Sequence, residues 1–101
     1  SHATHAVRFL TRKPASAIIE IVKDAFTHYD FELEKENLDC YKLRYKNQQG
    51  AQGIVIASVQ VFVLLDSLHL LEIKRIRGSI IRYSDLINAH LEELKLALNG
   101  M

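Results

Sequence analysis

The chain has 101 residues, of which 49% are hydrophobic and 25% charged, and this profile is typical of a single globular domain. No apolar run approaches the roughly 18 residues that cross a bilayer as a helix, which excludes a transmembrane helix. Cys40 is the only cysteine, so an internal disulfide is excluded and we expect a reducing, cytoplasmic location. We expect residues 1–6 to be a tag remnant or a disordered start, and residues 7–101 to form the domain.

The net charge is only +1, but the charges are sorted along the chain. Acidic residues outnumber basic ones between Glu20 and Asp39, whereas basic residues dominate between Lys42 and Arg82. A chain sorted in this way can present a basic patch without being basic overall.

The first elements expected are a strand and a helix. Residues 7–11 alternate between apolar and polar side chains, which predicts a strand. Pro14 suits the first turn of a helix, because the missing N–H of proline is not needed there. The apolar residues that follow recur at helical spacing and predict a helix of about four turns: Ile18, Ile21, Val22, Ala25 and Phe26.

Two short strands are expected after this helix. Residues 31–34 begin a new alternation, and residues 35–37 have the composition of a turn. Residues 40–46 then place Tyr41, Leu43 and Tyr45 on one face and basic residues on the other, which predicts a half-buried strand.

Two longer strands and a second helix complete the predicted elements. The turn at residues 47–50 leads to residues 54–65, the most apolar and β-branched stretch, which predicts a central strand. Residues 69–77 predict a further strand, whose alternation breaks near its end as at a bulge. Ser84 can cap a second helix, with Gly100 as its stop, and the apolar stripe of that helix is Ile87, Leu91, Leu94 and Leu98.

The order of these elements predicts the fold class. Consecutive strands joined by short turns imply an antiparallel sheet, because parallel pairs need long crossovers. We therefore expect an α+β protein in which two α-helices pack on one face of a small antiparallel β-sheet, in the order strand, helix, strands, helix. The other face of the sheet stays at least partly open.

The sequence gives no support for catalysis or metal binding. Asp66, Ser67 and His69 would share one tight turn, whereas a hydrolytic triad is assembled from separate elements. The glycines at 50 and 53 precede a strand and not the helix that a phosphate-binding loop requires, and Cys40 has no partner at metal-ligand spacing. We expect no catalytic residues, no metal and no cofactor.

Basic side chains remain as the candidate site. They form either a solvated face that keeps a sheet edge from aggregating or a surface that binds anionic lipid. Nucleic acid suits them less well, because no aromatic platform alternates with the bases. The candidate phospholipid-binding residues are Lys74, Arg75, Arg77, Lys42, Arg44, Lys46, Arg12 and Lys13, and the candidate protein-docking residues on the same open face are Ile54, Ile56 and Phe62.

Two segments resemble a known family. Residues 67–79, with Lys74-Arg75 before a glycine turn, are similar to the C-terminal kinase-associated-1 domain of microtubule-affinity-regulating kinases. Residues 8–19, with Arg12-Lys13-Pro14, resemble plant calcineurin-B-like-interacting kinases, in which this region forms part of a protein-phosphatase interaction segment. The resemblance implies a small sheet with two helices at the C-terminus of a serine/threonine protein kinase.

The resemblance and the bases together lead to two expectations. The first is a non-catalytic regulatory domain that binds acidic phospholipids peripherally at the plasma membrane and helps to restrain the kinase domain of its own chain. The alternative is a module that docks a phosphatase or another regulatory protein without binding lipid. Salt dependence separates them, because only the first relies mainly on charge.

Overall fold

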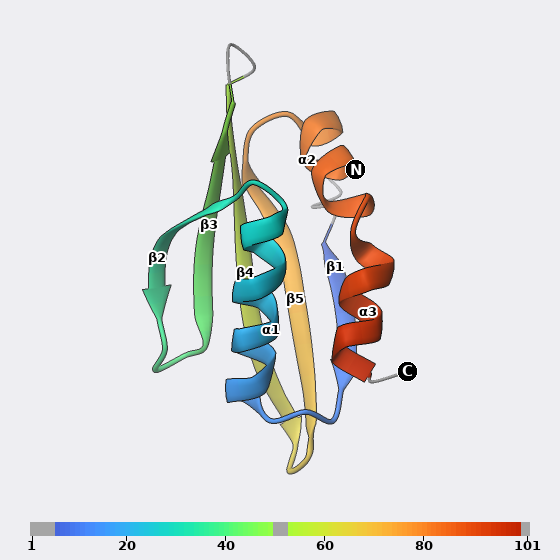
Figure 1. The fold of residues 1–101 in the computed structure, drawn as a ribbon. Coiled ribbons are helices and arrows are strands. Elements are labelled where there is room, and N and C mark those ends of the chain that lie inside the picture. The colour runs from blue at the N-terminus through green and yellow to red at the C-terminus, as the bar shows by residue number, and fades with distance from the viewer. Residues whose placement is uncertain (1–5, 50–52, 100–101) are drawn as a thin grey trace.

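The computed structural model describes residues 6–49 and 53–99, so residues 1–5 of the expected tag remnant at residues 1–6, as well as Gly50 and Gly100, lie outside the described residues. The described residues form one five-stranded antiparallel sheet with the strand order β1-β5-β4-β3-β2 and three helices on one face (Figure 1). The elements are β1 (Val7–Thr11), α1 (Ala15–His28), β2 (Glu32–Asn37), β3 (Lys42–Gln48), β4 (Ile54–Leu65), β5 (Leu68–Arg77), α2 (Ile80–Asn88) and α3 (Leu91–Asn99). The predicted α+β class is confirmed.

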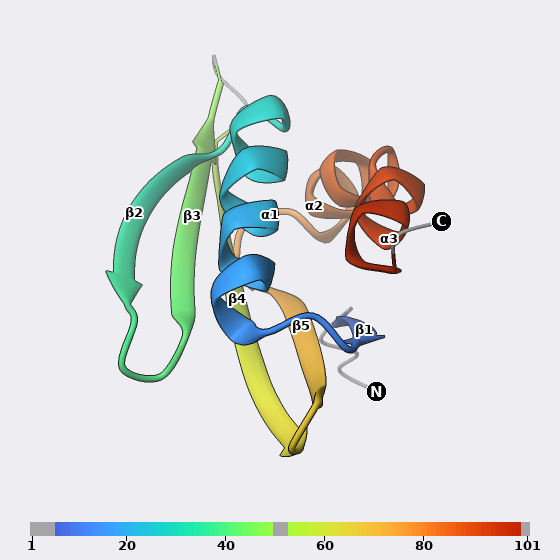
Figure 2. The same ribbon diagram turned by 60° about the horizontal axis from the view of Figure 1, so that its bottom comes forward.

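The core lies between the sheet and the three helices, which Figure 2 shows on the same side of the strands. In β4 the alternate residues Val55, Ala57, Val59 and Val61 are buried, with exposures of 3% or less, whereas Val63 near the β4–β5 turn is 63% exposed. The ring of Phe26 from α1 lies 4.5 Å from the ring of Tyr45 in β3, measured between centroids. This contact ties the first helix to the half of the sheet that carries the candidate bases.

The second predicted helix is two helices, and its predicted cap at Ser84 is wrong. Helix α2 begins after Ser79, whose hydroxyl accepts a hydrogen bond from the Arg82 N–H at 3.2 Å, and Ser84 lies inside the helix. The chain leaves the helical path between Asn88 and Leu91. At this break Tyr29 stacks on His90 with ring centroids 4.0 Å apart and donates its hydroxyl to the His90 carbonyl at 3.1 Å. The contact with Tyr29, the residue that follows α1, therefore lies at the break between α2 and α3.

The predicted turn at residues 35–37 is also wrong, because β2 continues through Asn37, which pairs with Lys42 of β3. The turn comes at residues 38–41, where the side chain of Asn37 accepts a hydrogen bond from the Asp39 N–H at 3.1 Å and Tyr41 has a φ of 50°. The strand instead contains a register shift between Leu33 and Lys35. This shift decides which side chains of β2 face outward.

The predicted irregularity near the end of β5 is confirmed. Arg77 pairs with Ile56 of β4, whereas Arg75 pairs with Ala57, so Ile76 is the extra residue of a bulge. Residues directly opposite each other share a face of the sheet. Because Ala57 is buried beneath the helices and Ile56 is not, the bulge places Arg75 and Arg77 on opposite faces.

Tyr83 in α2 allows a test of the packing. Its side chain is 1% exposed and its hydroxyl has no hydrogen-bond partner in the described part of the chain, and burial raises its pKa to about 12, with nearby Arg75 opposing the rise. We expect Tyr83→Phe to leave the free energy of unfolding at neutral pH unchanged or to raise it by up to about 1 kcal/mol. The matched change Tyr29→Phe, which removes the bond to His90, should lower it by about 1 kcal/mol.

The Tyr83→Phe variant also differs from the wild type in alkali. A tyrosine whose folded pKa is raised keeps its proton when the unfolded chain has lost it, so its contribution to stability is lost as the pH rises from its ordinary pKa of 10.0 towards about 12. Urea unfolding at neutral pH and above pH 10 should therefore show a steep loss of stability for the wild type and a shallower one for Tyr83→Phe. A loss of stability by Tyr83→Phe at neutral pH would mean that the hydroxyl is satisfied.

Candidate anion-binding surface

The bases of β3 lie on the face of the sheet opposite the helices. Leu43, Tyr45 and Asn47 point into the core with exposures of 2% or less, so the alternating residues Lys42, Arg44 and Lys46 face outward. This placement follows from the alternation that the sequence showed.

Cross-strand pairing extends these bases into a row. Ser58 of β4 lies opposite Arg44 on one side and Lys74 of β5 on the other, and Lys35 of β2 lies opposite Arg44. With neighbouring strands about 4.8 Å apart, three cations are spread over roughly 14 Å of one face. Ser58 is 4% exposed between its two basic neighbours, although it points away from the helices.

Two further rows flank this one. The first row crosses the sheet from β5 to β2 and consists of Arg77, Ile56, Lys46 and Glu32, each opposite the next. In the second, Lys42 lies opposite Gln60, and Glu72 is engaged by Arg8 at 3.0 Å. We call the set the outer basic face, which consists of Lys35, Lys42, Arg44, Lys46, Lys74 and Arg77.

The cations of the outer basic face form no close ion pairs within the described residues, although Glu32 lies opposite Lys46. Over residues 6–49 and 53–99 none of them has a carboxylate within 4.0 Å; the ion pairs found join Arg8 to Glu72 and Lys23 to Glu36. Three of these cations, Lys35, Lys42 and Arg44, line a hollow of about 280 Å³ between β2 and β3 together with Cys40. The face can therefore offer several donors to one anionic group.

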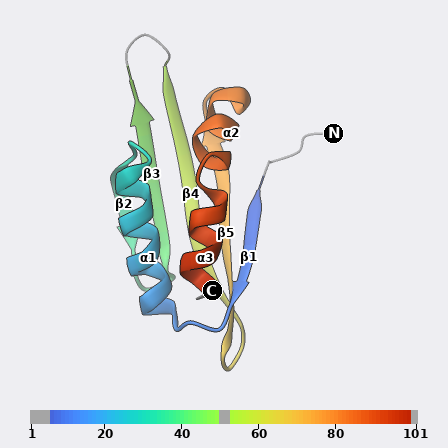
Figure 3. The ribbon, with the colours of Figure 1, turned by 45° about the vertical axis from the view of Figure 1, so that its right-hand side comes forward.

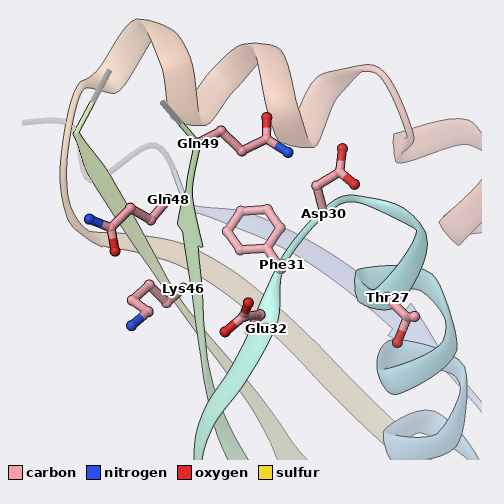
Figure 4. A pocket seen from close by; sticks show the side chains of 7 residues that line it. All are labelled: Thr27, Asp30, Phe31, Glu32, Lys46, Gln48 and Gln49. Atoms are coloured by element: carbon pink, nitrogen blue, oxygen red, sulfur yellow. The ribbon is translucent and has the colours of Figure 1, made fainter. Parts of the chain in front are cut away.

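A second hollow, of about 400 Å³, lies at the other end of β2 and β3 and is shown in Figure 4. Its seven lining residues come from the end of α1, the α1–β2 connection, β2, β3 and the residue after β3, and they include Lys46. Asp30 and Glu32 line the same hollow, so its charge is not positive. The hollow between Lys35, Lys42 and Arg44 is the better anion site of the two.

Three of the predicted phospholipid-binding residues lie away from the outer basic face. Arg75 is on the helix side, where its Nη1 donates to the Gly78 carbonyl at 3.1 Å. Arg12 and Lys13 lie in the β1–α1 connection at one end of the sheet, and Arg12 Nη1 donates to Ser67 Oγ at 3.3 Å. Lys74 and Arg75 are consecutive residues of β5 before the bulge, so ordinary alternation places them on opposite faces of the sheet.

Lys35 was missed by the sequence reasoning, which assigned it to a turn. The register shift after Leu33 brings Lys35 opposite Arg44, and no turn or alternation signal in the sequence marks that shift. The predicted docking residues Ile54 and Ile56 are half-buried on the outer face, and Phe62 is 37% exposed nearer the β4–β5 turn.

Neither a metal-binding cluster nor a membrane-crossing helix is found in the part of the chain that the structure describes. It contains no group of three or more His, Cys, Asp or Glu side chains placed to hold a metal ion. None of its helices combines the length and the apolar character needed to cross a bilayer.

No family model matches the chain. The sequence is 28% identical over 94 residues to CBL-interacting serine/threonine-protein kinase 10 of Arabidopsis thaliana, covering 93% of this chain and 19% of that kinase. It is 30% identical over 94 residues to CBL-interacting protein kinase 26 of Oryza sativa subsp. japonica, covering 93% and 18%. The resemblance to plant calcineurin-B-like-interacting kinases is thus confirmed, and the chain spans about a fifth of the length of the curated relatives it matches.

Among solved structures, the chain is similar to a START superfamily protein from Mycobacterium smegmatis. The TM-score is 0.61, with 14% sequence identity and coverage of 94% of this chain and 93% of that one. At this identity the similarity concerns the fold alone.

Proposed function

We propose that this chain is a non-catalytic C-terminal regulatory domain of a serine/threonine protein kinase and that its outer basic face binds acidic phospholipid headgroups. The kinase assignment is supported by the match of nearly the whole chain to about a fifth of several CBL-interacting protein kinases. That proportion leaves room in the relatives for a catalytic domain and suits a regulatory segment of the same polypeptide.

The observation that carries the lipid assignment is the arrangement of the outer basic face. Its six cations come from three strands, are free of ion pairs within 4.0 Å among the described residues, and lie on the side that the helices leave open. Each base near an anionic membrane contributes about 1 kcal/mol, so several together hold a domain weakly and reversibly. Peripheral and salt-sensitive association with the cytoplasmic leaflet follows from these numbers.

Restraint of the kinase domain can use the same surface. An acidic surface of the catalytic domain and an anionic bilayer would compete for the outer basic face, because both ligands neutralise the same cations. Arrival at the membrane would then shift the population towards the released kinase.

Vesicle sedimentation tests the lipid assignment. We expect the chain to sediment with vesicles of phosphatidylcholine and phosphatidylserine but not with phosphatidylcholine alone, and the bound fraction to fall steeply when salt rises from about 0.05 M to 0.15 M. Equal binding to both vesicle types, or no binding to either, would contradict the proposal.

A second candidate is the docking of a protein, such as a phosphatase, on the same face. The observation in its favour is that Ile54 and Ile56 lie half-buried beside Lys46 and Arg77, which gives the face an apolar component. Docking through these side chains would depend only weakly on salt and would not require vesicles.

A further inference from the structure

The β4–β5 hairpin ends in a group of exposed apolar side chains that the outer basic face does not include. Figures 1 and 3 show the hairpin projecting beyond the ends of α1 and β3, at the same end of the sheet as the β1–α1 connection. We call this group the apolar tip, which consists of Phe62, Val63, Leu64 and Leu65, with exposures of 37%, 63%, 46% and 68%.

Neighbouring strands extend the apolar tip. Phe62 lies opposite Leu70 of β5, and Leu70 lies opposite Leu10 of β1, which is 54% exposed. A contiguous apolar surface that stays in water is unfavourable, and on soluble proteins it usually marks a site of interaction. Because the tip projects from the molecule, we expect it to bind a medium or a surface that a protruding group can enter.

Basic residues surround the base of the apolar tip. Arg12 is held at the turn by its bond to Ser67 at 3.3 Å, and Lys13 follows it in the same connection. On the outer face Lys42 pairs with Gln60, two residues before Phe62. Asp66 in the turn is the one acid between Phe62 and Leu71.

An apolar protrusion with cations around its base matches an anionic membrane surface, in which charged headgroups cover apolar acyl chains. Leucine and valine side chains gain by entering the acyl boundary, while lysine and arginine remain level with the phosphates. We propose that the apolar tip inserts into the boundary between headgroups and acyl chains of an anionic bilayer, with Arg12, Lys13 and Lys42 at the headgroups. This inference rests on the proposed function, because charge must first bring the chain to the membrane.

The absence of tryptophan from the chain makes insertion directly measurable. Leu65→Trp places a single fluorophore at the tip, and Ile81→Trp places one at an equally exposed site on α2, where Ile81 is 75% exposed. With vesicles of phosphatidylcholine and phosphatidylserine, the emission of Leu65→Trp should shift to the blue and be quenched by lipids brominated on their acyl chains. The emission of Ile81→Trp should do neither.

Charge substitution gives the second readout. Leu64→Asp with Leu65→Asp should weaken vesicle binding by about tenfold or more, since each 1.4 kcal/mol of lost burial is a factor of ten. Ile81→Asp should leave binding within about twofold of wild type, because a difference of that size is below 0.5 kcal/mol. Val63→Trp is the reserve fluorophore if Leu65→Trp does not fold.

The outcomes separate insertion from headgroup binding. If Leu65→Trp and Val63→Trp sediment with anionic vesicles but show no shift and no quenching, insertion is wrong and headgroup binding stands. If neither variant nor the wild type sediments, both proposals fail. A blue shift that grows with protein concentration without vesicles, or on adding a purified kinase catalytic domain, would assign the tip to a second copy or to a protein partner and overturn insertion.

Discussion

The Gly78→Ala variant is expected to lose about 3 kcal/mol or more of unfolding free energy. Gly78 has a φ of 105°, a region that costs a residue with a Cβ about 1–3 kcal/mol. An added Cβ would also meet the backbone of the neighbouring strand, overlapping the Ile54 carbonyl oxygen and lying 2.9 Å from Val55 Cα. Because neither atom belongs to a side chain that can rotate away, β4 or the start of α2 has to move.

Gly53 provides the matched control for this prediction. It also has a positive φ, 86°, but an added Cβ would have nothing within 4 Å. Gly53→Ala should therefore cost only the backbone strain, about 1 kcal/mol. Urea unfolding followed by circular dichroism measures both variants. Equal losses would show that strain alone acts at Gly78, and that the close approach to β4 adds nothing.

Strands β1, β3 and β5 and the first helix could be predicted because their apolar periodicity and their burial agree. Residues 54–65 are almost continuously apolar and β-branched and form the central strand β4, and Pro14 directly precedes α1. The break between α2 and α3 could not be predicted. The apolar stripe continues across it, and the stacking of Tyr29 on His90 joins residues 61 positions apart.

The candidate site was predictable only where it depends on alternation within one strand. Lys42, Arg44 and Lys46 fall outward by the parity of β3. The faces of Arg77 and Lys35 depend instead on a bulge in β5 and a register shift in β2, and register is decided between strands. The sequence indicated an irregularity at residues 74–77 but not that it would turn Arg77 away from the helices.

Reversal of the two bases that flank Ser58 tests the central claim, which is that the outer basic face binds the membrane. Arg44→Glu and Lys74→Glu together place two carboxylates in the middle of the face. With two attractive contributions of about 1 kcal/mol lost and repulsion added, binding should weaken on the order of 100-fold. Lys95→Glu is the control, since Lys95 is exposed on α3, on the helix side of the sheet.

The most direct measurement is the affinity of these variants for vesicles of phosphatidylcholine and phosphatidylserine at low salt, after circular dichroism has shown that each is folded. We predict a loss on the order of 100-fold for Arg44→Glu with Lys74→Glu, about tenfold for Arg44→Glu alone, and at most about threefold for Lys95→Glu. Wild-type affinity in the double variant, or equal losses for Arg44→Glu and Lys95→Glu, would contradict a membrane site on the outer basic face.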